Sequence, residues 1–256
     1  MSSFAGKAVI VTGATSGIGR AAALEFARRG ASVLLVGRTE AALKETASQV
    51  DVSGARVATC VADVVEDSGP DRIVSAAVDA FGGLDVLVNA AGVIASGTIE
   101  ATSDDKWDAM MHVNVRAPFR LMRAAVPHLK ERKGSVVNVS SVNGLRAFAG
   151  VLAYNVSKSA MDHLTRCTAL EMAPFGVRVN CVNPGVTITN LHRRGGMDDA
   201  QYAAFLQRSK ETHPLGRPGQ PEEVAAMIVF LASDEAAWMT GETIPVDGGR
   251  HLTCLR

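Results

Sequence analysis

A glycine-rich loop near the N-terminus has the sequence Thr12-Gly13-Ala14-Thr15-Ser16-Gly17-Ile18-Gly19. A short apolar run leads into it, and a helix-like pattern follows at once. Glycines placed between a strand and a helix permit a tight turn and close approach of the backbone to a phosphate. The free N–H groups of the helix start then face an anion such as a pyrophosphate. The spacing G-x-x-x-G-x-G differs from the general G-x-G-x-x-G fingerprint, so its placement carries the prediction. The predicted dinucleotide contacts are Gly13, Ser16, Gly17, Ile18 and Gly19.

Short apolar runs alternate with helix-like segments along the rest of the chain. The runs are rich in Val and Ile with little polar alternation, as in a parallel sheet covered on both faces. The expected strands are Ala8–Thr12, Ala31–Gly37, Ala55–Ala62, Leu84–Ala90, Gly134–Ser140, Val177–Val182 and Thr243–Val246. The expected helices lie near 18–29, 40–50, 68–82, 104–131, 154–173 and 221–233. Strict alternation predicts an α/β fold, a doubly wound, Rossmann-type parallel sheet of about seven strands flanked by helices.

The 256 residues fit one domain with a single large core. No Pro/Ser-rich linker or shift in composition divides them, so we expect one domain over 1–256. Residues 185–217, which include Arg193-Arg194-Gly195-Gly196, form the one long stretch without clear periodicity. Their length indicates a functional loop, and we expect a substrate lid near 190–213.

Composition excludes several classes of function. The 26 basic and 26 acidic side chains give a net charge of +0, so no global field favours nucleic acid or an anionic membrane. No apolar run approaches the ~20 residues that span a bilayer. Four cysteines, at positions 60, 167, 181 and 254, form no CxxC pair and have no histidine cluster beside them. We therefore expect no disulfide framework and no metal site, and a cytoplasmic location.

The residue that closes the second strand bears on the choice of cofactor. An NAD site typically has Asp or Glu there to bind the ribose 2′-hydroxyl, but this sequence has Gly37-Arg38. An arginine suits a 2′-phosphate, so NADP(H) is the preferred cofactor, with NAD(H) possible. Because Thr15 and Ser16 leave the glycine loop without a basic residue, the strength of this preference stays open. Asp63 and the run Asn89-Ala90-Ala91-Gly92 also end strands, at the edge where such sheets bind ligands.

A third constellation follows the fifth strand. Ser141 ends it, Tyr154 comes thirteen residues later, and Lys158 follows after four more. A four-residue step places Tyr154 and Lys158 on one face of a helix, one turn apart. Acid/base work near neutrality requires lowering the tyrosine pKa by ~3 units from ~10. A nearby ammonium and an oxidised nicotinamide supply positive charge that favours the phenolate.

Taken in order, T-G-x-x-x-G-x-G, N-A-A-G, Ser and Y-x-x-x-K resemble the short-chain dehydrogenase/reductase superfamily, in its compact single-domain branch. The resemblance runs from Lys7 to about Gly249 and reaches the β-ketoacyl carrier-protein reductases. It implies an NAD(P)-dependent oxidoreductase acting on CH–OH/carbonyl groups. It implies Ser141 as the substrate-orienting hydroxyl, with Ser140 as its rival, and Tyr154 as proton donor or acceptor. It implies that Lys158 binds the nicotinamide ribose and lowers the tyrosine pKa, and that Asn114 holds a proton-relay water.

The same resemblance implies further cofactor contacts. Asp63 and Val64 match the adenine contacts, and Asn89 lies against the adenosine ribose in the motif that ends at Gly92. The motif often written N-N-A-G reads N-A-A-G here, a mild departure. The segment expected to pack on the nicotinamide and hold its carboxamide comprises Pro184, Gly185, Val186 and Thr189.

The expected activity is NADPH-dependent reduction of a small, moderately hydrophobic ketone or β-keto compound. The expected pocket wall is mostly apolar and comprises Ile94, Ala95, Val142, Phe148, Val151, Val186 and Leu191, with Asn143 and His192 adding polar contacts. The alternatives are an NAD-linked alcohol dehydrogenase, a β-ketoacyl carrier-protein reductase, a non-catalytic dinucleotide-binding regulator and a methyltransferase. The complete set of four candidate catalytic side chains argues against the regulator. A methyltransferase would not need Tyr154 and Lys158 and would require an acid near Arg38.

Two expectations concern partners. Carrier-protein reductases dock an acidic partner on basic residues; Arg132 keeps one such position beside Lys130 and Lys133, but Phe175 replaces the other. A free small-molecule substrate is therefore favoured. The resemblance also implies a homotetramer, and the helices near 104–131 and 154–173 carry apolar residues on more than one face, including Val115, Phe119, Leu164 and Leu170.

Overall fold

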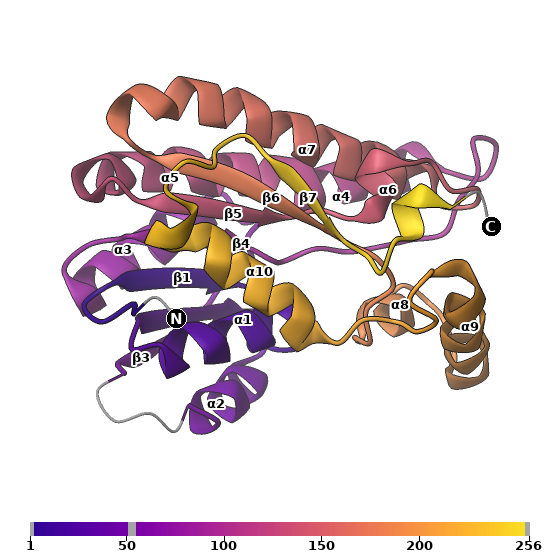
Figure 1. The fold of residues 1–256 in the computed structure, drawn as a ribbon, viewed down its shortest axis with the longest axis horizontal. Coiled ribbons are helices and arrows are strands. Elements are labelled where there is room, and N and C mark those ends of the chain that lie inside the picture. Colours follow the sequence, from indigo (N-terminus) through magenta and orange to yellow (C-terminus); the bar gives the residue numbers. More distant parts are fainter. Residues whose placement is uncertain (1–2, 51–54, 254–256) are drawn as a thin grey trace.

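The computed structural model describes residues 3–50 and 55–253. Within those residues, seven strands form one sheet in the order β3-β2-β1-β4-β5-β6-β7, with every neighbouring pair parallel. Their bounds are β1 Ala8–Thr12, β2 Ser32–Gly37, β3 Val57–Val61, β4 Val86–Asn89, β5 Ser135–Val139, β6 Arg178–Pro184 and β7 Thr243–Val246. The predicted fold class is confirmed, because the apolar runs are buried between two helical layers (Figure 1).

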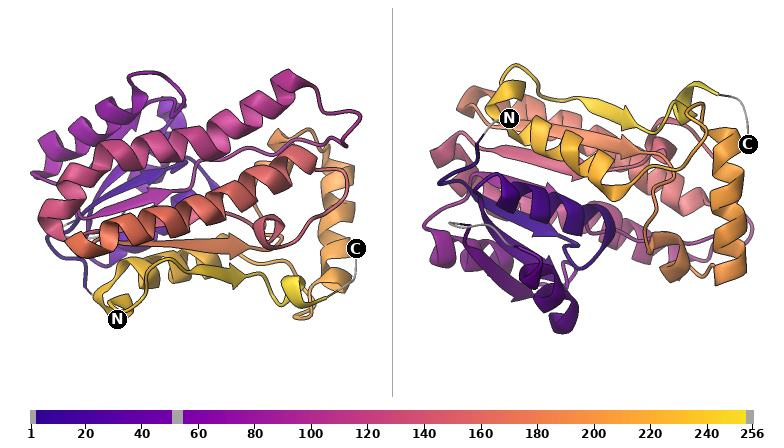
Figure 2. Two further views of the ribbon diagram at one scale, coloured as in Figure 1. Left: turned by 90° about the horizontal axis from the view of Figure 1, so that it is seen from above. Right: turned by 60° about the horizontal axis from the view of Figure 1, so that its bottom comes forward.

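The helices form a layer on each face of the sheet (Figure 1; Figure 2). One face carries α1 (Gly17–Arg28) and α10 (Pro221–Ala232), whose buried residues include Phe26 and Ile228. The other carries α3 (Gly69–Phe81), α5 (Ala117–Arg132) and α7 (Leu152–Met172). Helix α2 (Glu40–Ser48) packs beside β2 and β3, near the outer edge of the sheet.

The strand order reverses between β1 and β4, and this switch point positions the site. The Thr12 hydroxyl accepts hydrogen bonds from the N–H groups of Ala90 and Ala91, at 3.0 and 3.1 Å. These bonds tie the end of β1 to the turn after β4. In open α/β sheets, ligands bind in the crevice outside such strand ends.

The helix expected near 104–131 is interrupted. It consists of α4 (Asp104–Met111), a π-helical turn η1 (His112–Arg116) and α5. A π turn holds one extra residue and is common at functional sites. Here it carries the buried side chain of Asn114.

The segment 185–217 contains two helices that periodicity did not predict, α8 (Leu191–Arg194) and α9 (Asp199–Thr212). A capping box between Asp198 and Gln201 starts α9, and this pair was a usable signal in the sequence. The helix buries only Tyr202, Ser209 and Thr212 and so lacks an apolar stripe. The remaining short helices are α6 Val142–Leu145, η2 Ala173–Phe175, η3 Asp234–Ala236 and η4 Arg250–Leu252.

The cysteines are unpaired where the structure describes them. Cys60 and Cys181 are buried, Cys167 is exposed, and Cys254 lies outside the described residues. In the described part of the chain, no group of three His, Cys, Asp or Glu side chains is arranged to hold a metal ion. Nor does any helix described there have the length and apolar character needed to cross a membrane.

Candidate active site

A cavity of about 480 Å³ lies at the carboxyl ends of the central strands, beside α8. It brings together most of the residues predicted from sequence: Gly13, Ser16, Gly17, Ile18, Gly19, Gly92, Ser141, Tyr154, Lys158, Pro184, Gly185, Val186 and Thr189. Five others are not part of its lining: Arg38, Asp63, Val64, Asn89 and Asn114. The cavity therefore joins the glycine loop, the Ser-Tyr-Lys set and the segment after β6.

The glycine loop leaves room for a phosphate group. Gly13 has a φ of 67°, and a Cβ there would lie 2.9 Å from the Ala90 carbonyl oxygen. Gly17 has a φ of 55°, and its Cβ would lie 3.0 Å from Thr189 Cγ2, on the cavity side. Residues 17–20 include no Asp or Glu, so no carboxylate opposes an anion at the start of α1. Space, backbone N–H groups and charge all fit a dinucleotide pyrophosphate.

Arg38 and Asp63 lie side by side, at the ends of β2 and β3. Arg38 Nη1 is 3.7 Å from Asp63 Oδ2, and the Arg38 side chain is 71% exposed. Val64 is half-buried and packs against the core under α3. An exposed arginine with a loose ion pair is free to turn toward a 2′-phosphate.

Asn89 differs in detail from its expected role. Its side chain is buried and donates to Asn138 Oδ1 at 2.8 Å, within the sheet. Asn138 in turn donates to Thr165 Oγ1 at 2.9 Å. The Asn89 amide is therefore committed to joining β4 and β5, which leaves its backbone for a ribose contact.

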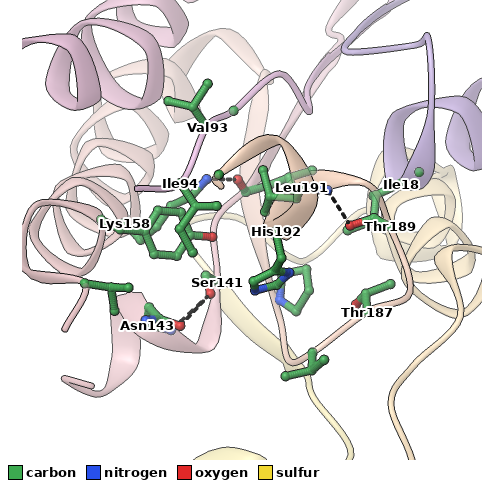
Figure 3. A pocket seen from close by; sticks show the side chains of 18 of the residues that line it. Ile18, Val93, Ile94, Ser141, Asn143, Lys158, Thr187, Thr189, Leu191 and His192 are labelled. Atoms are coloured by element: carbon green, nitrogen blue, oxygen red, sulfur yellow. Dashed lines mark hydrogen bonds between the residues drawn. The ribbon is translucent and has the colours of Figure 1, made fainter. Parts of the chain in front are cut away.

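The candidate catalytic side chains converge from β5 and α7 (Figure 3). Ser141 Oγ accepts from the Asn143 N–H at 3.2 Å and lies 3.1 Å from Asn143 Oδ1. Lys158 Nζ lies 5.6 Å from the centre of the buried Tyr154 ring and donates to the Val139 carbonyl at 2.9 Å. The geometry also separates the two serines, because Ser140 Oγ donates to the Lys158 carbonyl at 3.1 Å.

Asn114 lies next to this set, behind the cavity wall. Its Nδ2 donates to the Val93 carbonyl at 2.9 Å and to Ser157 Oγ at 3.0 Å, and its Oδ1 accepts from the Val93 N–H. A Cβ on Gly92 would lie 3.3 Å from Asn114 Oδ1 and 3.6 Å from Lys158 Nζ. Gly92 thus lets the asparagine and the lysine approach each other.

The chain is similar to known proteins over nearly its whole length. Residues 13–251 match the family model described as enoyl-(acyl carrier protein) reductase. An uncharacterized oxidoreductase of Thermotoga maritima is 41% identical, covering 96% of this chain and 98% of its own. A crystal structure of a short-chain dehydrogenase/reductase of unknown function from Caenorhabditis elegans, solved with cofactor, superposes with a TM-score of 0.92 at 36% identity, covering 98% and 97% of the two chains.

The chain belongs to the short-chain dehydrogenase/reductase family. Its relatives include the 3-oxoacyl-[acyl-carrier-protein] reductase of Thermotoga maritima, 36% identical over 95% of this chain and 97% of that one. Human dehydrogenase/reductase SDR family member 4 is 37% identical, covering 96% and 87%. Family membership makes the protein an oxidoreductase that uses NAD(P)(H), and the glycine loop fits that cofactor.

The tyrosine of this family member does not have a lowered pKa from its protein surroundings alone. Burial raises the pKa of Tyr154 to about 12, and the contact with Ser141 lowers it only in part. The expected lowering of this pKa by Lys158 stays a prediction; its ammonium lies 5.6 Å from the Tyr154 ring centre and donates to the Val139 carbonyl. Desolvation of the phenolate is the larger effect.

Lys158 is shifted in the direction that burial dictates. Removal from water lowers its pKa to about 8, and the nearby Cys181 and Asp162 raise it only in part. A lysine with a pKa near 8 is charged at neutral pH at a cost to the folded state.

Replacement of Lys158 by methionine tests this shift. Between pH 8 and 10.5, the unfolded chain binds a proton on Lys158 that the folded protein has lost, so stability rises with pH through that window. We expect the unfolding free energy of the wild type to gain about 2 kcal/mol over Lys158→Met between pH 7.5 and 10. Urea unfolding of both proteins without cofactor measures this difference. Parallel pH profiles would contradict it.

Several residues of the site had no sequence signal. His213 is a lone histidine whose Nε2 accepts from the Val186 N–H at 3.1 Å, while its Nδ1 lies 2.8 Å from the Ser209 carbonyl. It fixes the segment after β6, and burial lowers its pKa. Thr187 is buried and lines the cavity between Val186 and Thr189.

Arg194 is the third unexpected residue. Its Nη2 donates to Ser16 Oγ at 3.1 Å, and it lines the cavity from α8. It brings a positive charge to a glycine loop that has no basic residue of its own. Its neighbour Arg193 faces elsewhere, pairing with Asp199 at 2.9 Å.

The expected pocket wall is nearly complete. The lining includes Ile94, Val142, Phe148, Val151, Val186 and Leu191, together with the polar Asn143 and His192. Ala95 does not line the cavity; it packs instead against the small cluster of Met110, Ala153 and Tyr154. The adjacent Ser96 lines the cavity in its place.

Proposed function

We propose that the protein reduces a small, moderately hydrophobic ketone or β-keto compound to the alcohol with NADPH, in a reversible hydride transfer. The observation that carries this proposal is a single cavity lined by the glycine loop, Ser141, Tyr154 and Lys158. The cavity wall, which includes Phe148 and Leu191, is largely apolar, and this favours a substrate with a hydrocarbon body.

Each side chain has a defined task in this proposal. The bound nicotinamide supplies the hydride and, once oxidised, a positive charge close to Tyr154. Tyr154 donates the proton that the carbonyl oxygen takes up, and Ser141 holds that oxygen. Lys158 binds the nicotinamide ribose, and its charge favours the phenolate that Tyr154 leaves behind. Asn114, in contact with Val93 and Ser157, holds a water for proton relay.

The preference for NADPH rests on Arg38. No carboxylate closes β2 to bind a ribose 2′-hydroxyl, and the exposed guanidinium is placed at that strand end. Asp63 lies 3.7 Å away and competes for the same charge, so NAD(H) is accepted as well. Asp63 and Val64 contact adenine in this proposal, and Arg194 adds a cation at the glycine loop.

We propose that residues 1–256 act as one domain in which 190–213 form a lid. Helices α8 and α9 lie over the strand ends (Figure 1), and Gly195 and Gly196 connect them. A Cβ on Gly195 would lie 2.8 Å from Ile94 Cγ2, on the opposite side of the cavity. Buried, unpaired thiols at Cys60 and Cys181 support a reducing, cytoplasmic setting.

A screen of carbonyl compounds, followed at the nicotinamide absorbance with both NADPH and NADH, tests the function. Turnover of ketones with NADPH supports it, and better kcat/KM with NADH favours the alcohol dehydrogenase alternative. Binding of either nicotinamide without turnover of any carbonyl favours a regulator. A melting shift with S-adenosylmethionine instead of NADPH favours a methyltransferase.

The second candidate, a carrier-protein reductase, is favoured by the 36% identical relative that bears that name. The surface favours a free substrate, because the basic residues expected to dock a carrier protein make contacts within the chain. Lys130 Nζ lies 3.5 Å above the Phe175 ring, and Arg132 Nη2 donates to the Gly82 carbonyl at 3.0 Å. A comparison of kcat/KM for a β-ketoacyl carrier-protein thioester and for small ketones decides between them. A lead of orders of magnitude for the thioester at low salt, lost at high salt, would establish the carrier-protein reductase.

A homotetramer is the proposed assembly, and family members commonly form oligomers. Phe119 on α5 and Leu170 on α7 are 43% and 79% exposed, while Val115 and Leu164 are half-buried. We expect sedimentation velocity to show a species of four 26.8-kDa chains. Phe119→Glu and Leu170→Glu are expected to shift it toward smaller species, because a charge on a buried apolar contact is unfavourable. A monomer at every concentration would contradict the assembly.

A further inference from the structure

His192 projects from α8 into the cavity, toward the side from which Ser141 enters (Figure 3). Its Nδ1 atom is buried and has no hydrogen-bond partner within 3–50 and 55–253. Native structures rarely leave a buried polar atom unpaired, so this ring has hydrogen-bonding capacity that the described residues do not use. Nothing in the proposed proton transfer uses this ring.

The surroundings of His192 keep its ring neutral and fixed. The ring centre lies 4.4 Å from that of Phe205 and 6.5 Å from that of Tyr202, both on α9. Burial lowers the pKa of His192, so near neutral pH it offers one N–H donor and one lone pair. It therefore suits a polar oxygen of the substrate and supplies no charge for it.

A charged group lines the same cavity. Arg250, on η4, is 8% exposed, and its guanidinium carbon lies 4.9 Å from the centre of the Phe148 ring. Its Nη1 donates to the Thr212 carbonyl at 3.2 Å, at the end of α9. The aromatic ring and the carbonyl hold this guanidinium at the cavity wall.

Further positive charges lie near Arg250. Burial lowers its pKa most, the charges of Arg146 and Arg208 lower it further, and Asp247 raises it with a smaller effect. Among the residues that the structure describes, no Asp or Glu lines the cavity. A positively charged, acid-free wall favours an anion over a neutral or cationic ligand.

We propose that the substrate is a keto acid, or the hydroxy acid in the reverse direction, whose carboxylate is bound by Arg250 and His192. Arginine is the side chain best suited to a carboxylate, and the neutral imidazole N–H donates to its oxygen. The apolar Phe148, Val142 and Leu191 line the cavity around the hydrocarbon part. This inference rests on the proposed function and specifies its substrate class.

The reaction balances without a further reactant. The carbonyl carbon gains a hydride as NADPH becomes NADP⁺, and the carbonyl oxygen gains the Tyr154 proton, which the solvent restores. The carboxylate is unchanged, so Arg250 and His192 bind it equally before and after the transfer. Both are specificity residues, so their replacement is expected to change KM more than kcat.

Matched substrates test the class. A series of 2-, 3-, 4- and 5-oxo acids is compared with their methyl esters, under NADPH at low ionic strength. A charge-assisted pair is equivalent to about one to two decades in affinity, so we expect the best acid to exceed its ester by 10- to 100-fold in kcat/KM. Equal use of every acid and its ester by the wild type would overturn the proposal.

Variants locate the effect. Arg250→Met and His192→Phe are expected to raise KM for the acid at least tenfold and to leave the ester within threefold, while Arg250→Lys retains part of the preference. Lys106→Met removes one exposed charge from α4, outside the cavity and the proposed lid, and is the control. Equal losses on acid and ester in both Arg250→Met and His192→Phe would show a structural role and overturn the proposal.

Binding separates this inference from the proposed function. If no carbonyl compound is reduced with either nicotinamide, the proposed function fails, and calorimetry with the hydroxy acids in the presence of NADP⁺ still tests the anion site. Binding to the wild type that Arg250→Met weakens at least tenfold supports the site. Equal affinity in the two proteins, or none in the wild type, overturns it.

Discussion

Replacement of Tyr154 by phenylalanine is expected to lower kcat by about 10²–10⁴-fold, the usual contribution of a positioned general acid. Phenylalanine keeps the ring that packs against Met110 and Ala153, so the fold and the cavity shape are retained. Only the hydroxyl beside Ser141 is lost. Cofactor affinity, measured by titration of NADPH fluorescence, is expected to stay within a few-fold of the wild type.

The chain offers a matched control for this change. Tyr202, the one other tyrosine in the sequence, lies on α9, donates to the Thr189 carbonyl at 2.9 Å and accepts from its N–H at 3.2 Å. Tyr202→Phe removes a hydroxyl that binds the Thr189 backbone and has no proposed part in proton transfer, so its effect is expected in KM for the cofactor. Tyr154→Phe activity within a few-fold of wild type would refute the assignment.

Replacement of Arg38 by aspartate is expected to reverse the choice of cofactor. The wild type should prefer NADPH over NADH by about one to two decades in kcat/KM, the equivalent of one charge-assisted hydrogen bond. The variant loses that bond and repels the 2′-phosphate, so its NADPH activity should fall further than its NADH activity rises. The gain with NADH is limited because the new carboxylate lies close to Asp63.

Kinetics with both cofactors measure this reversal, and Lys44→Asp is the control. Lys44 is an exposed cation on α2 paired with Glu40, so its reversal makes the same change in net charge away from the strand ends. It is expected to leave the cofactor ratio within twofold. A wild type whose kcat/KM with NADH equals or exceeds that with NADPH would contradict the proposed role of Arg38.

Much of the fold follows from local patterns. The strands were predictable because both faces of a parallel sheet are buried. Such strands consist of continuous apolar runs such as Val33–Val36. The proximity of the candidate catalytic pair was predictable because Tyr154 and Lys158 are one helical turn apart, a relation that the sequence contains directly. Site positions that depend on a single element could therefore be located.

The rest depends on contacts between distant segments. Arg194 meets Ser16 across 178 positions, and Arg250 reaches the cavity from the last turn of the described chain. Neither belongs to a periodic pattern. The raised pKa of Tyr154 is likewise a collective effect of burial, which no motif records. Periodicity could not predict helix α9, because the helix buries few apolar residues.

The π turn at His112–Arg116 makes this stretch more sensitive to deletion of a residue than to substitution of side chains. Deleting one residue there would restore an ordinary α-helical turn and change which side chain of the turn occupies the position of Asn114. Asn114 would then lose its three bonds to Val93 and Ser157. Side-chain exchanges along this helix are therefore expected to be tolerated better than a deletion, because a deletion would disrupt the packing behind Lys158.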